Sequence, residues 1–342
     1  MTGPPTPRRA PSARGRGRTL GWVSAAVAVA AIAAGVTAAI VFAGGVTTDD
    51  GVSGDDRPVQ ASALSKAALA AADAEAGTPE HDAAAYLSEQ PTAYWLTPES
   101  TPVTSVQARI GQLASEARDQ SARLAIVVYG LPDRDCGGLS AGGLDDDAYA
   151  EWTAAIGEAL AGAGDLSPIV MLEPDSLALA PECGGVDARV RHLRGAIDAL
   201  AAPATRIYVD GGHSNWLPID EMAGLIERLD ADGEIRGFAT NVSNFNRTAD
   251  EVSYAHALSA RLGGLHAVID TSRNGAGSNG EWCNPPGRLV GDPGGTIADD
   301  VVDANLWIKP PGESDGACNG GPPAGEWWPE AAVELTRRNV AR

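Results

Sequence analysis

Short apolar runs alternate with amphipathic stretches along the chain beyond about residue 120. The stretches at 148–164, 187–202 and 249–263 repeat their apolar residues with the spacing of a helix. The short runs have the apolar and β-branched character of buried parallel strands. Alternation of this kind predicts a parallel α/β sheet or barrel. The runs lie at 124–131, 167–175, 206–213, 237–244, 266–274 and 304–312.

Each of these six runs ends in polar or ionisable residues. A helix cap or a turn would explain one such end, but six successive ends favour a shared site. In an α/β barrel the carboxyl ends of the parallel strands lie on one face, and that face holds the active site. The residues are Arg134 and Asp135; Glu173 and Asp175; Asp210 and His213; Asn241, Ser243 and Asn244; Asp270, Arg273 and Asn274; and Lys309, Glu313 and Asp315.

Carboxylates dominate this predicted cleft, and Asp135, Asp175 and Asp315 suit proton transfer. Neighbouring carboxylates raise each other's pKa, so one of them can stay protonated and act as an acid. Cleavage of a glycosidic bond needs this combination, with one acid for the leaving oxygen and one base for water. The same cluster could hold Ca²⁺, but the D-x-D-x-D-G spacing is absent and the neighbouring Arg and Lys disfavour a cation. We therefore expect no metal and no cofactor.

Tryptophan is the commonest aromatic residue, with eight Trp against three Phe. Sugars present apolar C–H faces that stack on indole rings, while their hydroxyls need hydrogen bonds. Trp95, Trp216 and Trp282 fall beside the polar strand ends and are candidate sugar platforms. Trp307 lies inside an apolar run, so we expect it in the core.

The first 80 residues differ in composition from the rest. Residues 1–20 contain five arginines and no acid, and residues 21–45 contain no charge. About 20 apolar residues cross a bilayer as a helix, and arginines before such a helix stay on the cytoplasmic side. We expect a basic cytoplasmic tail at 1–20 and a transmembrane anchor, or else a cleaved export signal, at 21–45. An acidic Ala-rich linker at 46–80, with a short helix near 67–74, would then lead to a catalytic domain at 81–342.

The cysteines agree with an extracellular location for that domain, either membrane-anchored or secreted. An even number of cysteines in an exported region predicts two disulfides, for which the sequence alone permits three pairings. A zinc site is the alternative, but no C-x-x-C spacing is present. The four cysteines are Cys136, Cys183, Cys283 and Cys318.

Charge and composition exclude several classes of protein. The chain has 342 residues, with 45 acidic against 25 basic side chains and a formal charge of −20. A net negative surface repels phosphates and argues against binding to nucleic acid. A hydrophobic content of 44% argues against wholesale disorder. We expect a monomeric catalytic domain whose partners are a sugar substrate and, through the N-terminal helix, a membrane.

The polar strand ends lie in six segments that resemble glycoside hydrolase family 6, the inverting β-1,4-glucanases that include endoglucanases and cellobiohydrolases. The segments occur in the family's order and cover most of the chain from about residue 80 to 340. The resemblance implies a distorted, incomplete parallel α/β barrel, similar to a TIM barrel, with the active site at the carboxyl ends of the strands. The segments are VVYGLPDRDCGGLSAGG (127–143), IVMLEPDSLAL (169–179), YVDGGHSNW (208–216), GFATNVSNF (237–245), VIDTSRNGAGSNGEWCNPPGR (268–288) and LWIKPPGESDGAC (306–318).

The resemblance also implies roles for individual residues. Asp175 corresponds to the general acid, and Asp135 to the acid that raises its pKa and helps to order the attacking water. Asp315 corresponds to the proposed base, and Tyr129 to the tyrosine beside the reacting sugar. The positions that match groups binding the substrate or lying near the site are Trp95, Asp210, His213, Trp216, Asn241, Ser243, Trp282, Lys309 and Glu313.

The resemblance pairs Cys136 with Cys183 and Cys283 with Cys318. Three places depart from the family pattern, and one of them is the stretch 217–219, where no second Trp follows Trp216. Gly130 stands where a side chain is usual, which we expect to loosen the loop before Asp135, and Phe245 stands where Tyr is common.

Loop lengths predict the mode of attack. The segments between Asp175 and Cys183, and between Cys283 and Cys318, are short, whereas exo-acting members of the family carry longer loops that roof a tunnel. We therefore expect endo-acting hydrolysis of β-1,4 bonds in cellulose or related β-glucans, with inversion of the anomeric configuration. The alternatives are an exo-acting cellobiohydrolase and a catalytically silent, surface glucan-binding protein on the same fold.

Overall fold

The computed structural model describes residues 57–231, 233–295 and 299–340. These residues belong to one compact unit, which runs from Ser53 to Arg342. The predicted cytoplasmic tail (1–20) and apolar segment (21–45) lie outside the described residues. Within the described ranges, no helix is long and apolar enough to cross a membrane.

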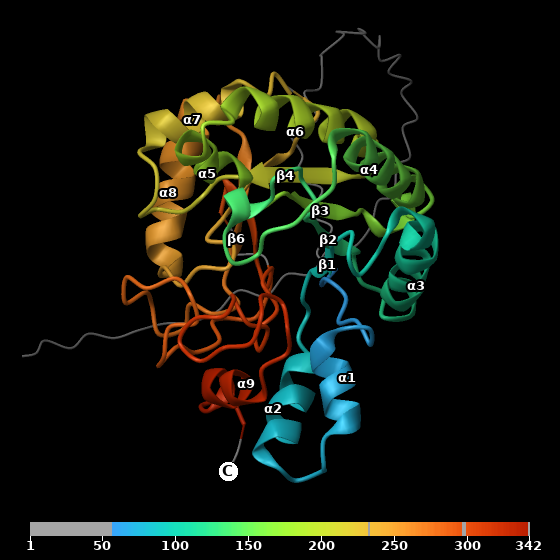
Figure 1. Ribbon diagram of the computed structural model, residues 1–342, viewed down its shortest axis with the longest axis vertical. Helices are drawn as coiled ribbons and strands as arrows, with labels where there is room; N and C mark the ends of the chain where they lie inside the picture. The colour runs from blue at the N-terminus through green and yellow to red at the C-terminus, as the bar shows by residue number, and fades with distance from the viewer. Residues whose placement is uncertain (1–56, 232, 296–298, 341–342) are drawn as a thin grey trace, which may run out of the picture. The chain divides into compact units, whose positions relative to one another are not determined.

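Seven parallel strands form a single curled sheet in which each strand pairs with its neighbours in chain order (Figure 1). The six predicted strands are confirmed, and a seventh precedes them. The sheet is an incomplete barrel, because its two edges meet at one point, where the Ala93 amide donates to the Trp307 carbonyl oxygen at 2.9 Å. The strands are β1 (Tyr94–Leu96), β2 (Ala125–Val128), β3 (Ile169–Leu172), β4 (Arg206–Asp210), β5 (Gly237–Thr240), β6 (His266–Asp270) and β7 (Val302–Leu306).

Both faces of the sheet are buried, which explains why the strands read as continuous apolar runs. Successive side chains along a strand point to opposite faces. On β2, Val127 points inward and packs in a small core with Met171 and Tyr208, whereas Ile126 and Val128 pack outward in the core that includes the helices. The inner core is filled by side chains, so the site can lie only at the ends of the strands.

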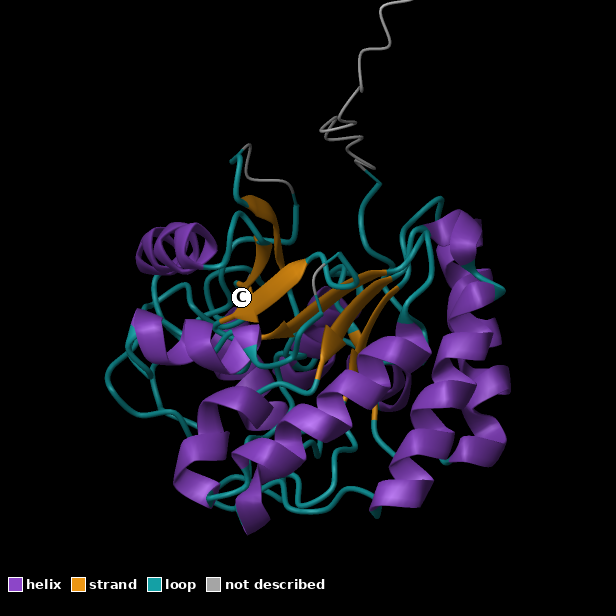
Figure 2. Cartoon of the chain, turned by 90° about the horizontal axis from the view of Figure 1, so that it is seen from above, coloured by secondary structure: helices purple, strands orange, loops and turns teal. Residues whose placement is uncertain are grey.

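Helices follow the strands and lie around the outside of the curled sheet (Figure 2). The three helices predicted from the sequence are confirmed to within a few residues as α4 (Asp146–Ala161), α6 (Val186–Leu200) and α8 (Thr248–Arg261). Single-turn 3₁₀ helices occur at Val103–Ser105, Asp135–Gly137 and Gly164–Leu166. The helices that follow β1 to β5 are α3 (Val106–Asp119), α4 (Asp146–Ala161), α5 (Ser176–Cys183), α6 (Val186–Leu200), α7 (Ile219–Glu227) and α8 (Thr248–Arg261).

Three further helices, α1 (Lys66–Asp73), α2 (Pro79–Ser88) and α9 (Pro329–Thr336), pack together although they come from the two ends of the described chain (Figure 1). Their shared apolar cluster includes Leu87 and the predicted core residue Trp307, which is buried. This group of helices adjoins the two edges of the sheet, since Trp307 directly follows β7.

The predicted linker at 46–80 does not match the structure over residues 57–80, although the short helix predicted near 67–74 is confirmed as α1. Gln60 is fully buried, and its side-chain amide bonds both the carbonyl oxygen and the amide of Ala125 on β2, at 3.2 and 2.9 Å. A composition of small and acidic residues is typical of a linker, but this segment packs against the barrel at the amino end of β2. The compact unit therefore starts well before the predicted boundary at residue 80.

Glycines on two outer helices test the tight packing of this layer. A Cβ added to Gly157 of α4 would lie 1.9 Å from the Ala199 carbonyl oxygen of α6, whereas one added to exposed Gly111 of α3 meets nothing within 4 Å. We expect Gly157→Ala to lower the free energy of unfolding by about 1–3 kcal/mol. Gly111→Ala should raise it by about 0.5–1 kcal/mol, the usual helix preference for alanine. Urea unfolding of both variants checks this, and equal effects would contradict the packing.

Candidate active site

The polar residues predicted to meet do lie together, at or just beyond the carboxyl ends of the parallel strands. Asp135 and Asp175 follow β2 and β3, and both line a small pocket together with Tyr129. Asp315 follows β7, and its charge acts on Asp175 together with the charges of Asp135 and Asp210. The three aspartates that sequence reasoning singled out therefore belong to one electrostatic unit.

Asp175 is held by the start of the helix that follows it. Its backbone is left-handed, with φ of 68°. The Asp210 carboxylate, at the end of β4, accepts the amides of Leu177 and Ala178 at 3.0 Å each. These bonds satisfy donors that a helix N-terminus otherwise leaves free. Asp210 thereby fixes the first turn of α5 and the position of Asp175.

The Asp175 carboxyl is partly buried and surrounded by like charges. Burial raises its pKa well above the ordinary value of an aspartate, and the charges of Asp210, Asp135 and Asp315 raise it further, whereas Lys309 lowers it. A carboxyl in such a place keeps its proton to higher pH than an ordinary aspartate does, which suits a general acid.

Asp135 is joined to Tyr129 through a serine that sequence reasoning missed. Asp135 Oδ2 accepts from the amide of Ser140 at 2.8 Å and from its hydroxyl at 2.9 Å. Because that hydroxyl proton is committed, Tyr129 must donate to Ser140 Oγ, at 2.8 Å. Burial and the nearby Asp175 charge raise the pKa of Tyr129, so it remains a neutral donor.

The sequence does contain a signal for Ser140. Residues 138–142 read G-x-S-x-G, the pattern of the nucleophile elbow in the α/β-hydrolase fold. That elbow requires a strand–turn–helix context, whereas Ser140 lies in a long loop between β2 and α4. Within the described residues its hydroxyl bonds to Asp135 and Tyr129 rather than to a histidine. Its position is that of a hydrogen-bonding partner.

Asp315 is buried in a network of donors. Arg273 Nη1 lies 2.9 Å from both of its oxygens, and the Asn284 amide donates to Oδ2 at 3.0 Å. Lys309 Nζ lies 3.8 Å from Oδ1. Arg273 also stacks on Phe245, with its Cζ 4.5 Å from the ring centre. These donors occupy oxygens that a base would need to offer to water.

One wall of the site carries an aromatic and cationic group around Trp95. Its ring lies edge-on to Tyr129, with centroids 5.1 Å apart, and its Nε1 donates to the Ile308 carbonyl at 2.8 Å. Lys309 Nζ lies 5.6 Å from the ring centre. Glu313, also predicted to bind sugar, is half-buried on the loop after β7 and pairs with Lys66 at 3.2 Å.

The other two predicted platforms differ from each other. Trp216 is half-buried and its ring lies 5.3 Å from that of His213. Burial lowers the pKa of His213 to about 4, so the imidazole is neutral at neutral pH. Trp282 is 57% exposed, which is unusual for so large an apolar side chain.

Two predicted sugar-binding residues face the protein instead. Asn241 has no exposed surface, its Oδ1 accepts from the Asn246 amide at 3.0 Å, and its Nδ2 donates to the Asp270 carbonyl at 2.8 Å. Asp210 is likewise occupied by backbone amides. Ser243 is half-buried, and its amide is bound by the Asp270 carboxylate at 3.1 Å. Asp270, which ends β6, therefore supports the loops as Asp210 does.

Glu173 is a further buried carboxyl that was not assigned a role. It is 1% exposed and accepts the Gly130 amide at 2.9 and 3.1 Å. A side chain at Gly130 would meet Trp152, with its Cβ 2.6 Å from the indole ring. The expected loosening at Gly130 is therefore wrong, because the glycine lets the chain pack against Trp152.

Both disulfides implied by the resemblance are confirmed. Cys136 is bonded to Cys183, and Cys283 to Cys318. The first ties the loop of Asp135 to the end of α5, whose first turn holds Asp175. The second ties the loop after β6 to the loop that carries Asp315.

Two loops meet beside the site. A Cβ added to Gly316, on the loop after β7, would lie 2.7 Å from Leu139 Cβ on the loop after β2. The chain segments that carry Asp135 and Asp315 are thus in van der Waals contact, which the endo mode predicted from the short loops did not anticipate.

Comparison with known proteins decides the family. Residues 54–339 match the family described as Glycosyl hydrolases family 6. The chain belongs to glycosyl hydrolase family 6. This confirms the resemblance inferred from the motifs, and the curled parallel sheet confirms the predicted fold class.

Family 6 relatives include both endo- and exo-acting proteins. The chain is 43% identical over 248 residues to Endoglucanase A of Cellulomonas fimi, a match that covers 72% of this chain and 54% of that one. It is 37% identical over 265 residues to a 1,4-beta-D-glucan cellobiohydrolase of Podospora anserina, covering 63% of each. The chain thus spans only about half the length of the first relative.

A solved family 6 structure matches the fold closely. The endoglucanase Cel6 of Mycobacterium tuberculosis, in complex with methyl-cellobiosyl-4-deoxy-4-thio-beta-D-cellobioside, superposes with a TM-score of 0.76 at 37% identity. The match covers 82% of this chain and 97% of that one.

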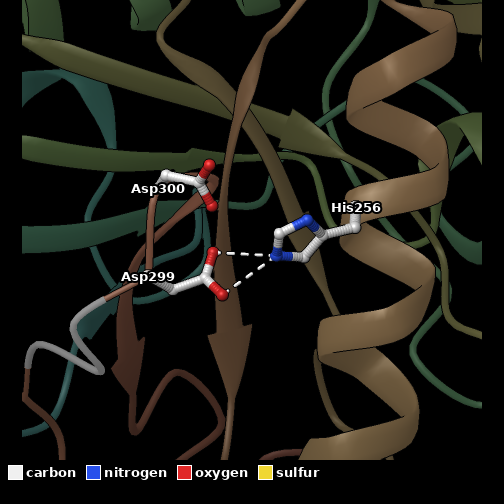
Figure 3. A group of neighbouring side chains, drawn as sticks. All are labelled: His256, Asp299 and Asp300. Carbon is white, nitrogen blue, oxygen red and sulfur yellow. Dashed lines mark hydrogen bonds and ion pairs between the residues drawn. The ribbon is translucent and has the colours of Figure 1, made fainter.

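One group of potential metal ligands lies elsewhere in the described part of this family 6 chain. His256 on α8 and the neighbouring Asp299 and Asp300 face one another (Figure 3). Asp299 and Asp300 directly precede β7, so the group lies at the amino ends of the strands, whereas the aspartates of the site lie at the carboxyl ends. His256 Nε2 lies 3.0 and 2.9 Å from the two oxygens of Asp299, and this ion pair accounts for the group.

Glu173 predicts a measurable link between pH and stability. Burial raises its pKa to about 7, against about 4.3 in an unfolded chain. A raised folded pKa means stability that is present below about pH 4.3 and lost as pH rises through about 7. We expect the wild type to lose up to about 3 kcal/mol of unfolding free energy over this window relative to Glu173→Gln. Urea unfolding at pH 5 and pH 7.5 checks this, and parallel pH profiles of the two proteins would contradict it.

Proposed function

We propose that the chain hydrolyses β-1,4-glucosidic bonds in cellulose or related β-glucans by endo attack with inversion, with Asp175 as general acid. The observation that carries the proposal is the position of Asp175, which shares a pocket with Asp135 and Tyr129 and whose pKa is raised by burial and by the surrounding carboxylates. A protonated carboxyl at the mouth of a sugar-binding cleft can give its proton to the leaving oxygen.

Asp135 serves the attacking water in this proposal. Its Oδ2 is held by Ser140, so its orientation is fixed before substrate binds. An inverting reaction places water on the sugar face opposite the acid, between carboxyls about 6.5–9.5 Å apart. Asp315, with its oxygens already bound by Arg273 and Asn284, acts as a fixed negative charge. The water proton then leaves along a chain of waters rather than directly to Asp315.

Sugar binding falls to the aromatic and charged groups along the cleft. Trp95, Trp216 and Trp282 offer indole faces for stacking, and Trp282 is the most exposed of them. Lys309, whose Nζ lies 5.6 Å from the Trp95 ring centre, supplies a donor for sugar hydroxyls, and Glu313 supplies an acceptor. Named relatives support this substrate class, since the structural neighbour from Mycobacterium tuberculosis holds a thio-cello-oligosaccharide.

The endo mode rests on the relatives and on the short loops. The bacterial endoglucanases are 38–43% identical to the chain, against 32–37% for fungal proteins named cellobiohydrolases or exoglucanases. The contact between Leu139 and Gly316 favours the exo alternative, because touching loops restrict entry of a long chain. We place the endo mode first because the chain is more similar to the bacterial endoglucanases than to the fungal proteins named cellobiohydrolases.

We further propose that residues 1–45 hold the catalytic unit at the outer side of a membrane. The support is the sequence alone: five arginines precede 25 uncharged residues. The two disulfides suit an oxidising compartment. A secreted enzyme would result if the apolar segment is cleaved.

Removing the acid tests the function directly. We expect Asp175→Ala to lower reducing-sugar release from carboxymethylcellulose by about 10²–10⁴-fold, the usual contribution of general acid catalysis. The matched control is Asp165→Ala, which removes an exposed carboxylate paired with Arg118 and should keep full activity.

The products of the wild type decide between the alternatives. An endo-acting, inverting enzyme releases a range of oligosaccharides whose new ends appear first as the α anomer by NMR. Cellobiose alone would favour the exo mode, and no release would favour a silent glucan-binding protein. Near-normal activity of Asp175→Ala would refute the acid assignment.

Asp135 should control the pH range of the enzyme. Its negative charge raises the pKa of Asp175, and the acid works only while protonated, so activity falls as pH rises through that pKa. We expect Asp135→Asn to lower the pKa of Asp175 and move the alkaline limb of kcat/KM to lower pH. A pH–rate profile measures this, and a limb that stays in place or moves to higher pH would contradict the coupling.

A further inference from the structure

The chain has two lysines against 23 arginines, and both lysines lie beside Glu313. Lys309 follows β7, and its pKa responds to the charges of both Glu313 and Lys66. Lys66 comes from α1, in the segment that the sequence suggested was a linker. Its Nζ lies 3.2 Å from Glu313 Oε2, and it also donates to the Gly325 carbonyl oxygen. Residues far apart in sequence thus converge on one carboxylate.

Lys66 occupies a position that a lysine does not favour. It is the first residue of α1, directly after the N-cap Ser65, whose hydroxyl accepts the Ala68 amide at 3.1 Å. The N-terminus of a helix carries positive partial charge, so a cation there costs rather than gains stability. No acidic residue in the first turn of α1 offsets this. A residue that breaks a local preference points to a functional demand.

We propose that Lys66 positions the Glu313 carboxylate, and the loop that carries it, for binding a glucosyl unit stacked near Trp95. This inference rests on the proposed glucanase function. Glu313 accepts from Lys66, and the bond to Gly325 ties the same ammonium to the far part of the loop. Without it, the carboxylate can turn away from the sugar hydroxyls and the loop loses its tie to α1. Lys66 is thus a positioning residue for substrate binding and takes no part in bond cleavage.

The chemistry of lysine suits this task. An ammonium has three donors on a compact point charge. Two of them serve Glu313 and Gly325, and the side chain is 48% exposed, which leaves a third donor toward solvent and incoming sugar. Lys309 is buried beside it and completes the cationic surroundings of Glu313. Lys66 therefore holds the Glu313 carboxylate by direct contact, and Lys309 adds a second positive charge near it.

Binding of cellohexaose in the Asp175→Ala background, where cleavage is blocked, tests the proposal by calorimetry. We expect Lys66→Met to weaken binding about tenfold, from the loss of one charge-assisted hydrogen bond. Lys66→Arg should recover most of that loss, because it keeps a donor to the carboxylate. Arg261→Met is the matched control and should leave binding unchanged. Arg261 lies on α8, its side chain is 49% exposed, and it pairs with Asp220 on α7.

A double-mutant cycle separates positioning from a merely structural role. In a Glu313→Gln background, Lys66→Met should weaken binding less than about twofold, because its effect passes through Glu313. With Asp175 intact, Lys66→Met should raise KM and keep kcat within about twofold. Unchanged binding in Lys66→Met, or a full tenfold loss in the Glu313→Gln background, would overturn the proposal. A parent protein that neither binds cellohexaose nor cleaves glucans would instead refute the proposed function itself.

Discussion

The site depends on keeping one carboxyl protonated among other carboxylates. Charge repulsion makes such a cluster costly, and burial adds to the cost, so the fold must hold Asp175 in place against both. It does so with backbone hydrogen bonds: Asp210 accepts the first amides of α5, and its own charge raises the pKa of Asp175. One residue therefore fixes the acid and tunes it.

The same device recurs around the sheet. Asp210 ends β4 and Asp270 ends β6. The carboxylate of each accepts hydrogen bonds from backbone amides of loops that carry site residues. Several residues along this edge have left-handed backbone, including Asp135, Asp175 and Ser243, with φ of 55°, 68° and 61°. Such conformations are costly for residues with side chains and persist where the surroundings over-determine them. Buried carboxylates and two disulfides provide that constraint here.

Sequence reasoning predicted the frame of the molecule and part of its site. The strands were readable because both faces of the sheet are buried, and the polar strand ends identified Asp135, Asp175 and Asp315. The same reasoning missed β1, since three residues give too short a pattern. It also misjudged residues 57–80, where an Ala-rich segment packs through Gln60 and α1 against distant parts of the chain.

The direction of a side chain was harder to predict than its place. Asn241 lies at the expected strand end, but its amide is consumed by Asn246 and Asp270. Lys66 was missed because its contact with Glu313 crosses a long sequence separation. Ser140 was missed although its partners Asp135 and Tyr129 are near in sequence, because its pattern is typical of a nucleophile and its role here is to hold Asp135. A direct titration of the Asp175 carboxyl by ¹³C NMR, assigned with the Asp175→Asn variant, tests the central claim. The account predicts a pKa well above the ordinary range of an aspartate, and titration near 4 would contradict it.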